Sequence, residues 1–180
     1  MAKQVIVTGS SGIAAALIRA LDARGDAIYV VGGIDSESEA LQNECKNIKG
    51  YSSVDLREED QTISAFQSAN ESLGKVTDVV GIVGGSGRKF GDSRVDEISL
   101  DAWNHTLALN LSTAFLTLRE GVKLLRKNGG SVTLTGSVLA TSPVTEHFTT
   151  HAYATSKAAL EGLVRVSATS FISEKIRINA

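Results

Sequence analysis

Short apolar runs alternate with longer amphipathic segments along the whole chain. The apolar runs are rich in β-branched residues and predict strands at about residues 3–8, 27–32, 49–54, 77–83, 131–136 and 175–179. The segments between them carry apolar residues at three- and four-residue spacings and predict helices at about 12–24, 36–46, 58–73, 101–127 and 152–173. The pattern therefore describes strands that alternate with helices.

The predicted strands are continuously apolar instead of alternating between apolar and polar residues. Val5-Ile6-Val7 in the first strand and Val79-Val80-Gly81-Ile82-Val83 in the fourth are typical. A strand of this kind has both faces covered, which is the situation in a parallel sheet with helices on either side. The sequence thus predicts a Rossmann-type, doubly wound α/β fold with three αβα layers, formed by residues 1–180 as a single domain.

Composition and charge exclude several classes of function. The chain has 180 residues, 42% of them hydrophobic and 21% charged, and a formal net charge of -2, as in an ordinary globular protein. Its charges are interspersed, so a nucleic-acid partner is not expected. One cysteine and three histidines without ligand spacing predict neither a disulfide framework nor a metal site. No apolar run suits a signal peptide or a membrane span, which favours a cytoplasmic protein without a membrane partner.

A glycine-containing turn follows the first predicted strand and opens a helix. Gly9 permits the tight turn, and Gly12 lets the backbone approach a pyrophosphate. The helix then offers unpaired N–H groups and the positive end of its dipole to the phosphates. The expected dinucleotide-binding residues of this turn are Thr8, Gly9, Ser10, Ser11, Gly12 and Ile13.

Acidic residues come close after the second and third predicted strands. Asp35 follows slightly late, and it either reaches the adenosine ribose or begins the next helix. Asp55, followed by Leu56, either meets the adenine or caps the helix that begins near Glu58. Both alternatives stay open at both positions.

The second strand ends in Gly32-Gly33, which leaves space where an acidic residue would exclude a 2′-phosphate. No arginine or lysine occurs at residues 9–12 or 32–36 to bind such a phosphate. The expected cofactor is therefore NAD or NADP with little discrimination, and NAD is slightly favoured.

Tyr153 and Lys157 lie four residues apart at the start of the last helical segment, so both side chains project from one helical face. Tyrosine has a pKa of about 10, and a cation close by lowers it. Such a pair suits a general acid, although chance places the same two residues on many helices. Other parts of the sequence have to decide between these interpretations.

Two further polar residues occupy informative positions. Asn110 lies inside the apolar helix 101–127, where it either binds water at a site or caps a broken helix. Ser137 follows the fifth strand, and ligands in open α/β sheets bind at the carboxyl ends of strands. The apolar stripe expected on the helix consists of Trp103, Leu107, Leu111, Phe115, Leu118, Val122 and Leu125.

Taken in order, these motifs resemble the short-chain dehydrogenase/reductase family along the whole chain. The matching motifs are Thr8-Gly9 with Gly12, Asp55-Leu56, Trp103 with Asn110-Leu111, Gly136-Ser137-Val138, Tyr153 to Leu160, and Ile176 to Ala180. The resemblance implies a catalytic set of Asn110, Ser137, Tyr153 and Lys157.

The resemblance also implies a role for each member of this set. Tyr153 exchanges a proton with the substrate oxygen while hydride passes to or from nicotinamide, and Ser137 positions that oxygen. Lys157 lowers the pKa of the tyrosine and holds the nicotinamide ribose. Asn110 supports a proton-relay water, and Asn110, Tyr153 and Lys157 also count among the cofactor-binding residues.

The chain departs from the family pattern in four places. The glycine turn is one residue shorter than usual, as in larger epimerase-type relatives. Strand four ends in Ile82-Val83-Gly84-Gly85 where the family has Asn-Asn-Ala-Gly, so a bracing amide is lost although Gly84 and Gly85 should still border the cofactor. The loop 139–152, which holds Pro143 and His147, is longer than usual. Relatives continue past the position of Ala180 into a further strand and a substrate-covering segment, so the native chain is expected to continue as well.

The function expected from these features is an NAD(P)-dependent oxidoreductase that acts on a small carbonyl/alcohol substrate. The alternatives are a nucleotide-binding sensor or scaffold without turnover, and a sugar-nucleotide epimerase or dehydratase. Arg88 and Lys89 could attract an anionic substrate, although exposed loop cations are usually solvated. Relatives commonly pair the helices 101–127 and 152–173, so a homodimer or homotetramer is expected.

Overall fold

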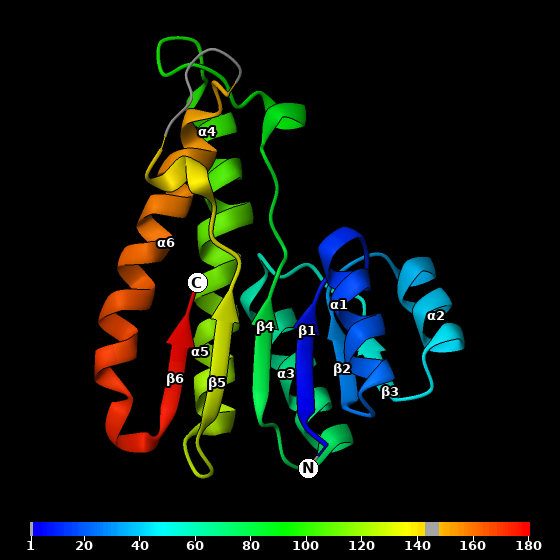
Figure 1. The fold of residues 1–180 in the computed structure, drawn as a ribbon. Helices are drawn as coiled ribbons and strands as arrows, with labels where there is room; N and C mark the ends of the chain where they lie inside the picture. Colours follow the sequence, from blue (N-terminus) through cyan, green and yellow to red (C-terminus); the bar gives the residue numbers. More distant parts are fainter. Residues whose placement is uncertain (1, 143–147) are drawn as a thin grey trace.

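The computed structural model describes residues 2–142 and 148–180, so Pro143 and His147 lie outside the described residues. Six parallel strands form one sheet in the order β3-β2-β1-β4-β5-β6 (Figure 1). Their bounds are β1 (Gln4–Thr8), β2 (Ala27–Val31), β3 (Ile48–Ser52), β4 (Asp78–Gly81), β5 (Gly130–Leu134) and β6 (Ile176–Asn179). Each strand lies within a few residues of its predicted place.

Helices cover both faces of the sheet, which confirms the doubly wound α/β fold. α1 (Gly12–Ala23) and α2 (Asp35–Glu44) lie on one face, in front of β1 to β3 in Figure 1. α3 (Glu59–Leu73), α5 (Thr113–Leu125) and α6 (His151–Ser170) lie on the other face. α4 (Leu100–Leu107) rises above the sheet, and 3₁₀ turns occur at η1 (Arg88–Phe90), η3 (Val138–Ala140) and η4 (Ile172–Glu174).

The central strand shows how a continuous apolar run serves such a fold. Val5 and Val7 of β1 point into the core under α1 and α2, whereas Ile6 points into the core under the helices of the opposite face. All three side chains are buried. Because successive side chains of a strand face opposite ways, only a run without polar interruptions fills both cores.

The predicted helix 101–127 contains an irregular turn that changes which residues face the core. α4 passes into the π turn η2 (Ala108–Ser112) and then into α5. A π turn adds a residue to the helical turn, so the residues that follow rotate relative to a regular pattern. After the π turn, Ala114 is buried and Phe115 is 44% exposed, while Leu118, Val122 and Leu125 are buried as predicted. The prediction that Phe115 belongs to the buried stripe is therefore wrong.

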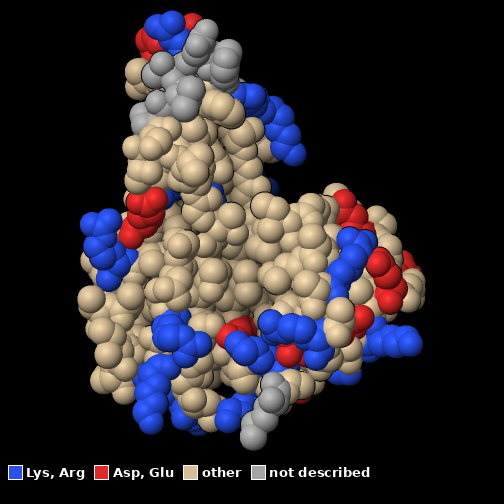
Figure 2. Space-filling view, viewed as in Figure 1, with Lys and Arg blue, Asp and Glu red and all other residues tan. Residues whose placement is uncertain are grey.

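The face shown in Figure 2 carries charges of both signs, gathered mainly along the lower edge and the right side. That lower edge is the amino end of the sheet in Figure 1. The middle of the face in Figure 2 is largely free of charged side chains. Between residues 2 and 142 and between 148 and 180, no helix has the length and apolar character needed to cross a membrane.

Candidate active site

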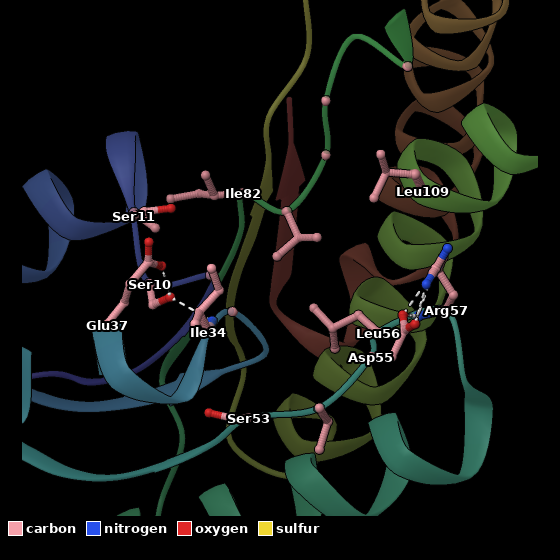
Figure 3. Close-up of a pocket in the computed structure, with 18 of the residues that line it drawn as sticks. Ser10, Ser11, Ile34, Glu37, Ser53, Asp55, Leu56, Arg57, Ile82 and Leu109 are labelled. Carbon is pink, nitrogen blue, oxygen red and sulfur yellow. Dashed lines mark hydrogen bonds and ion pairs between the residues drawn. The ribbon is translucent and has the colours of Figure 1, made fainter. Parts of the chain in front are cut away.

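A cavity of about 1060 Å³ opens at the carboxyl ends of the central strands, beside the point where the strand order reverses between β1 and β4 (Figure 3). Ligands of doubly wound sheets bind at this kind of switch point. Of the residues predicted to bind the cofactor, eight line the cavity: Gly9, Ser10, Ser11, Ile13, Asp55, Leu56, Gly84 and Gly85. The others, Thr8, Gly12, Asn110, Tyr153 and Lys157, are not part of its lining.

The turn between β1 and α1 has the backbone that the sequence predicts. Gly9 and Gly12 have φ angles of 95° and 54°, in the left-handed region that favours glycine. A Cβ atom on Gly12 would meet no other atom within 4 Å, so the turn faces open space. The first turn of α1 contains no acidic side chain, which leaves the positive end of its dipole to an anion. These features suit a pyrophosphate.

Thr8 holds two strands together instead of facing the cavity. Its side chain is 1% exposed, and its Oγ1 accepts hydrogen bonds from the backbone N–H groups of Ile82 (2.8 Å) and Val83 (3.2 Å). The hydroxyl therefore joins the end of β1 to the segment after β4. Part of the bracing that a strand-four asparagine would supply comes from this threonine.

Glu37 lines the cavity, although the sequence analysis did not identify it. Ser10 Oγ donates a hydrogen bond to Glu37 Oε2 (2.7 Å) and accepts one from the N–H of Ile34 (3.1 Å), as Figure 3 shows. Gly33 makes this arrangement possible, because a Cβ atom there would lie 2.2 Å from Ser10 Oγ. Asp35, the first residue of α2, is exposed and is not part of the lining.

The signal for Glu37 was the glycine pair that ends β2. The Gly32-Gly33 turn packs tightly against Ser10 of the β1–α1 turn, so an acid that borders this part of the cavity comes from the first turn of α2. Asp35 and Glu37 both fit that description in sequence, and only the fold distinguishes them.

Asp55 lines the cavity but is already paired. Its Oδ1 accepts hydrogen bonds from the backbone N–H (2.9 Å) and from Nε (2.9 Å) of Arg57. The Arg57 guanidinium holds the pKa of the Asp55 carboxyl below its ordinary value. Glu58 is the residue that precedes α3, and the Asp55 side chain closes a turn before it. Asp55 therefore forms a local ion pair and does not cap α3, whose N-cap residue is Glu58, while its role beside the adenine stays a prediction.

Asn110 is fully buried in the π turn, where its amide forms three hydrogen bonds to backbone groups. Oδ1 accepts a hydrogen bond from the N–H of Gly85 (3.0 Å), and Nδ2 donates to the carbonyl oxygens of Gly85 (2.9 Å) and Thr106 (2.9 Å). Asn110 lies inside a continuous helical run, so it does not cap a broken helix, and its role beside a proton-relay water stays a prediction. It braces the segment after β4 from the opposite side to Thr8.

Gly84 packs closely against the side chains of both Asn110 and Lys157. A Cβ atom on Gly84 would lie 2.7 Å from Asn110 Oδ1 and 3.6 Å from Lys157 Nζ. An alanine there would press on the asparagine, which is held on three sides. The glycine that replaces the alanine of the family pattern is thus explained by the position of the Asn110 amide.

Lys157 is 3% exposed, and its Nζ donates a hydrogen bond to the carbonyl oxygen of Thr135 (2.6 Å), beyond the end of β5. Burial lowers the pKa of this ammonium. Within the described ranges no carboxylate forms an ion pair with it. The ring centroid of Tyr153, one turn earlier on α6, is 5.8 Å from Nζ.

Ser137 follows β5 at the same end of the sheet. Its Oγ accepts a hydrogen bond from the N–H of Leu139 (3.2 Å), which leaves the hydroxyl hydrogen available to another acceptor. Ser137 lines a second cavity of about 720 Å³ together with Gly136, Val138, Thr141, Glu161, Val164, Arg165 and Ala180. The turn η3 beside it packs against α6.

The loop after β4 brings cations and aromatic rings to the rim. Lys89 lies over the ring of Phe90, and Phe90 stacks on His105 with centroids 3.8 Å apart. Arg88 lies 5.9 Å from the ring centroid of Phe148. Both cations line the large cavity, so an anion-binding role for them stays a prediction.

Comparison with known proteins places this arrangement in a wider group. The family model described as enoyl-(acyl carrier protein) reductase matches residues 7–180. A 3β-hydroxysteroid dehydrogenase of Mediterraneibacter gnavus is 28% identical over 99% of this chain and 64% of its own length. A short-chain dehydrogenase of Penicillium roqueforti is 31% identical over 98% of this chain and 66% of its own length.

A solved structure resembles the whole described fold. The crystal structure of a 3-ketoacyl-ACP reductase from Sinorhizobium meliloti matches with a TM-score of 0.86 and 26% identity, over 98% of this chain and 70% of the other. The chain thus spans about two thirds of the length of the relatives it matches. Because one family model covers nearly all of it and relatives match from end to end, the chain belongs to the short-chain dehydrogenase/reductase family.

Proposed function

We propose that this chain forms the nicotinamide-binding and catalytic part of an oxidoreductase that interconverts a small carbonyl compound and the corresponding alcohol, with Tyr153 as the general acid or base. The observation that carries the proposal is the burial of Lys157 against a single carbonyl oxygen. Burying an ammonium without a carboxylate partner destabilises a fold. Buried ionisable groups of this kind are concentrated at functional sites, where catalysis uses their altered pKa.

Tyr153 and Lys157 share a helical face at the end of the sheet where Ser137 also lies. In this proposal the Tyr153 hydroxyl gives its proton to, or takes it from, the substrate oxygen. Ser137 donates its hydroxyl hydrogen to the same oxygen and orients it. Lys157 keeps two of its three ammonium hydrogens free after bonding Thr135, and it directs them toward the phenol and the cofactor ribose.

The residues of the large cavity fit a nicotinamide dinucleotide. Its volume of about 1060 Å³ slightly exceeds the usual range for small-molecule sites, roughly 300–1,000 Å³, as an extended ligand requires. Gly9, Ser11 and Ile13 would hold the pyrophosphate at the start of α1, and Leu56 would cover the adenine. When bound, the nicotinamide accepts or supplies the hydride.

Glu37 favours NAD over NADP more strongly than the sequence alone indicates. Its carboxylate lies beside Ser10, where the ribose next to the phosphate-binding turn would be met. A carboxylate accepts a hydrogen bond from a 2′-hydroxyl and repels a 2′-phosphate. The lining also contains the cations Arg57, Arg88 and Lys89, and Asp55 already pairs with Arg57.

One argument for a nucleotide-binding sensor without turnover is weakened by the structure. That alternative drew on the loss of the strand-four asparagines, yet Thr8 and Asn110 supply hydrogen bonds to the same segment. The short glycine turn is the one feature noted above that resembles epimerase-type relatives, and a pyrophosphate suits it in either family.

The proposal is tested by titrating NADH and NADPH into the protein and following nicotinamide fluorescence, and then by assaying reduction of a panel of ketones and aldehydes. We expect NADH to bind and at least one ketone to be reduced in a time-dependent way. Tight cofactor binding without reduction of any carbonyl would support the sensor instead. Binding of neither cofactor would refute the proposal.

We propose in addition that the protein associates with itself through α5 and α6. A groove of about 300 Å³ lies between these helices, lined by Phe115, Val122, Leu163 and Phe171 among others. Phe115 and Val166 are exposed, as the surface of a homodimer or homotetramer would require before assembly. Sedimentation should show a dimer or tetramer that dissociates in Phe115→Glu, and a monomer at micromolar concentration would contradict this.

A further inference from the structure

The start of α6 is capped by a side chain that comes from far away in the sequence. Asp92 lies in the loop between η1 and α4, and its side chain is 6% exposed. Its Oδ1 accepts the N–H of Ala152 (3.0 Å), and its Oδ2 accepts the N–H of Tyr153 (2.9 Å). Each carboxylate oxygen thus holds one backbone donor of the turn that carries the tyrosine.

The helix has no cap of its own at this end. Thr150, the residue before α6, makes no side-chain capping hydrogen bond. The first N–H groups of a helix have no partner within the helix. A carboxylate there forms charge-assisted hydrogen bonds and meets the positive end of the helix dipole. Asp92, from a distant loop, therefore supplies the capping acceptor that the residues just before α6 do not provide.

Neighbouring residues of the same loop hold the helix start as well. The N–H of His151 donates to the carbonyl oxygen of Ser93 (3.2 Å), and the N–H of Val95 donates to Nδ1 of His151 (2.9 Å). The loop 92–95 and the first turn of α6 are thus joined by hydrogen bonds in both directions.

Asp92 is also tied to the loop that lines the large cavity. Its N–H donates to the carbonyl oxygen of Gly87 (3.1 Å), a residue of the cavity wall. Gly87 has a φ of 73°, and a Cβ atom on it would lie 2.9 Å from Asp92 Cβ and 2.3 Å from Thr106 Oγ1. This close packing fixes Asp92 between the cofactor side of the loop and the helix start.

We propose that Asp92 is a positioning residue that sets the place of the Tyr153 phenol, an inference that rests on the function proposed above. Tyr153 is the third residue of α6, where the helix itself does not restrain the backbone N–H. Lys157 lies one turn further along and is separately held by Thr135. Loss of Asp92 therefore moves the tyrosine relative to the lysine and leaves the lysine in place.

The activity test compares Asp92→Ala and Asp92→Asn with Asp96→Ala in the full chain. Asp96 is an exposed residue of the same loop that pairs with Arg94. We expect kcat to fall about 10- to 100-fold in Asp92→Ala, because a small misplacement of a reacting group has effects of that size. Asp92→Asn keeps one acceptor and should lose less, while the dissociation constant for NADH stays unchanged and Asp96→Ala matches the unmodified protein.

A double variant separates positioning from general destabilisation. If Asp92 acts through Tyr153, adding Asp92→Ala to Tyr153→Phe should not lower the residual rate further. A further drop by the same factor as in the single variant would overturn the inference.

Hydrogen exchange provides a readout that needs no turnover. The peptide that contains Ala152 and Tyr153 should exchange its amide hydrogens faster in Asp92→Ala than in Asp96→Ala. Unchanged exchange together with unchanged kcat would overturn the positioning role alone. Absence of turnover in the unmodified protein would instead overturn the proposed function, whatever the exchange shows.

Discussion

The amino and carboxyl ends of the sheet both bury polar and ionisable side chains, but they satisfy them with different partners. At the amino end, Asp78 is 8% exposed and accepts hydrogen bonds from Lys3 Nζ (3.0 Å), from Thr77 Oγ1 (2.8 Å) and from Ser131 Oγ. Asp26 accepts the N–H of Lys3 (2.9 Å) and pairs with Arg24. Side chains and backbone together saturate these two carboxylates.

At the carboxyl end three buried groups around the proposed catalytic residues bond to backbone atoms. Asn110 pairs with Gly85, Lys157 with Thr135, and Asp92 with the start of α6. Backbone partners fix where such a group lies, and they leave some of its hydrogen-bonding capacity unused. Lys157 has three N–H donors and the Thr135 carbonyl takes one, whereas Asp78 has three donors on its two oxygens.

The difference teaches how one sheet serves two purposes. An end of the sheet whose charged groups pair with one another contributes to stability and has few unused hydrogen-bonding groups for a ligand. An end whose polar groups are positioned by the backbone retains donors for a substrate or cofactor. The predictions below alter one end and measure whether the other responds.

The largest expected effect concerns the carboxyl end. Tyr153→Phe should lower kcat by about 10³-fold, within the range of 10²–10⁴ typical of a lost general acid, because the hydroxyl is the proposed proton donor. The dissociation constant for NADH should stay within about twofold, since the loss affects only the chemical step.

Tyr51→Phe on β3 is the matched control for this change, because Tyr51 does not line the cavity. Steady-state kinetics and fluorescence titration make both measurements. Retention of more than a few per cent of activity in Tyr153→Phe would remove the tyrosine from its role.

The opposite end should respond in stability instead of rate. Asp78→Ala leaves the half-buried hydroxyl groups of Thr77 and Ser131 and the Lys3 ammonium without this acceptor, so the free energy of unfolding should fall by about 2–3 kcal/mol. Asp96→Ala removes an exposed pair and should change it by less than about 0.5 kcal/mol. Urea unfolding measures both values. A loss of kcat in Asp78→Ala under folding conditions would show that the two ends are not independent.

A smaller effect is expected on cofactor choice. Glu37→Gln removes the carboxylate that would face a 2′-phosphate, so the dissociation constant for NADPH should fall about tenfold, or 1.4 kcal/mol. Asp35→Asn changes an acid of the same helix that does not line the cavity, so the dissociation constant for NADPH should not change. If NADPH binds as well as NADH before any substitution, Glu37 does not select the cofactor.

The smallest effect appears in the pH dependence of stability. The hydrogen bond from the Lys3 N–H lowers the pKa of Asp26. Burial alone would raise the pKa of Asp78, but hydrogen bonds from Ser131, Lys3 and Thr77 outweigh it and leave the pKa below its ordinary value.

The unfolded chain therefore binds more protons at acidic pH, and stability rises with pH in that window. The contribution should be fully present above about pH 5 and decline as the pH falls below about 4. Urea unfolding between pH 3 and pH 7 should give a shallower acidic decline in Asp78→Ala than in the unmodified protein. Parallel curves would mean that Asp78 does not titrate with folding.

Much of the fold follows from local pattern, because a continuous apolar run specifies a strand buried on both faces whatever its neighbours are. The glycine turn is equally local, and it occupies the predicted place beside the cavity. The positions that sequence reasoning missed depend on local irregularity or on residues far away. Phe115 is exposed a few residues after a π turn that has no sequence signal, and Thr8 Oγ1 bonds to Val83, 75 residues away.

Glu37 and Asp92 were missed for a related reason. An acid in the first turn of a helix ordinarily signals nothing beyond that helix. Glu37 matters because a glycine pair in the preceding turn lets Ser10 approach α2. Asp92 matters because its loop crosses to a helix that begins some 60 residues later. Neither contact has a periodic signature.

The reversal of strand order at β1 also has a consequence for the newly made chain. β1 pairs with β2 on one side and with β4 on the other, and β4 ends only at Gly81. While the first half emerges from the ribosome, β1 to β3 with their helices can assemble, but one edge of β1 stays open. We expect the long-range pairing of β4, and then the docking of Asp92 onto α6, to be late and slow events in folding. The proposed catalytic end would then be the last part of the described chain to acquire its geometry.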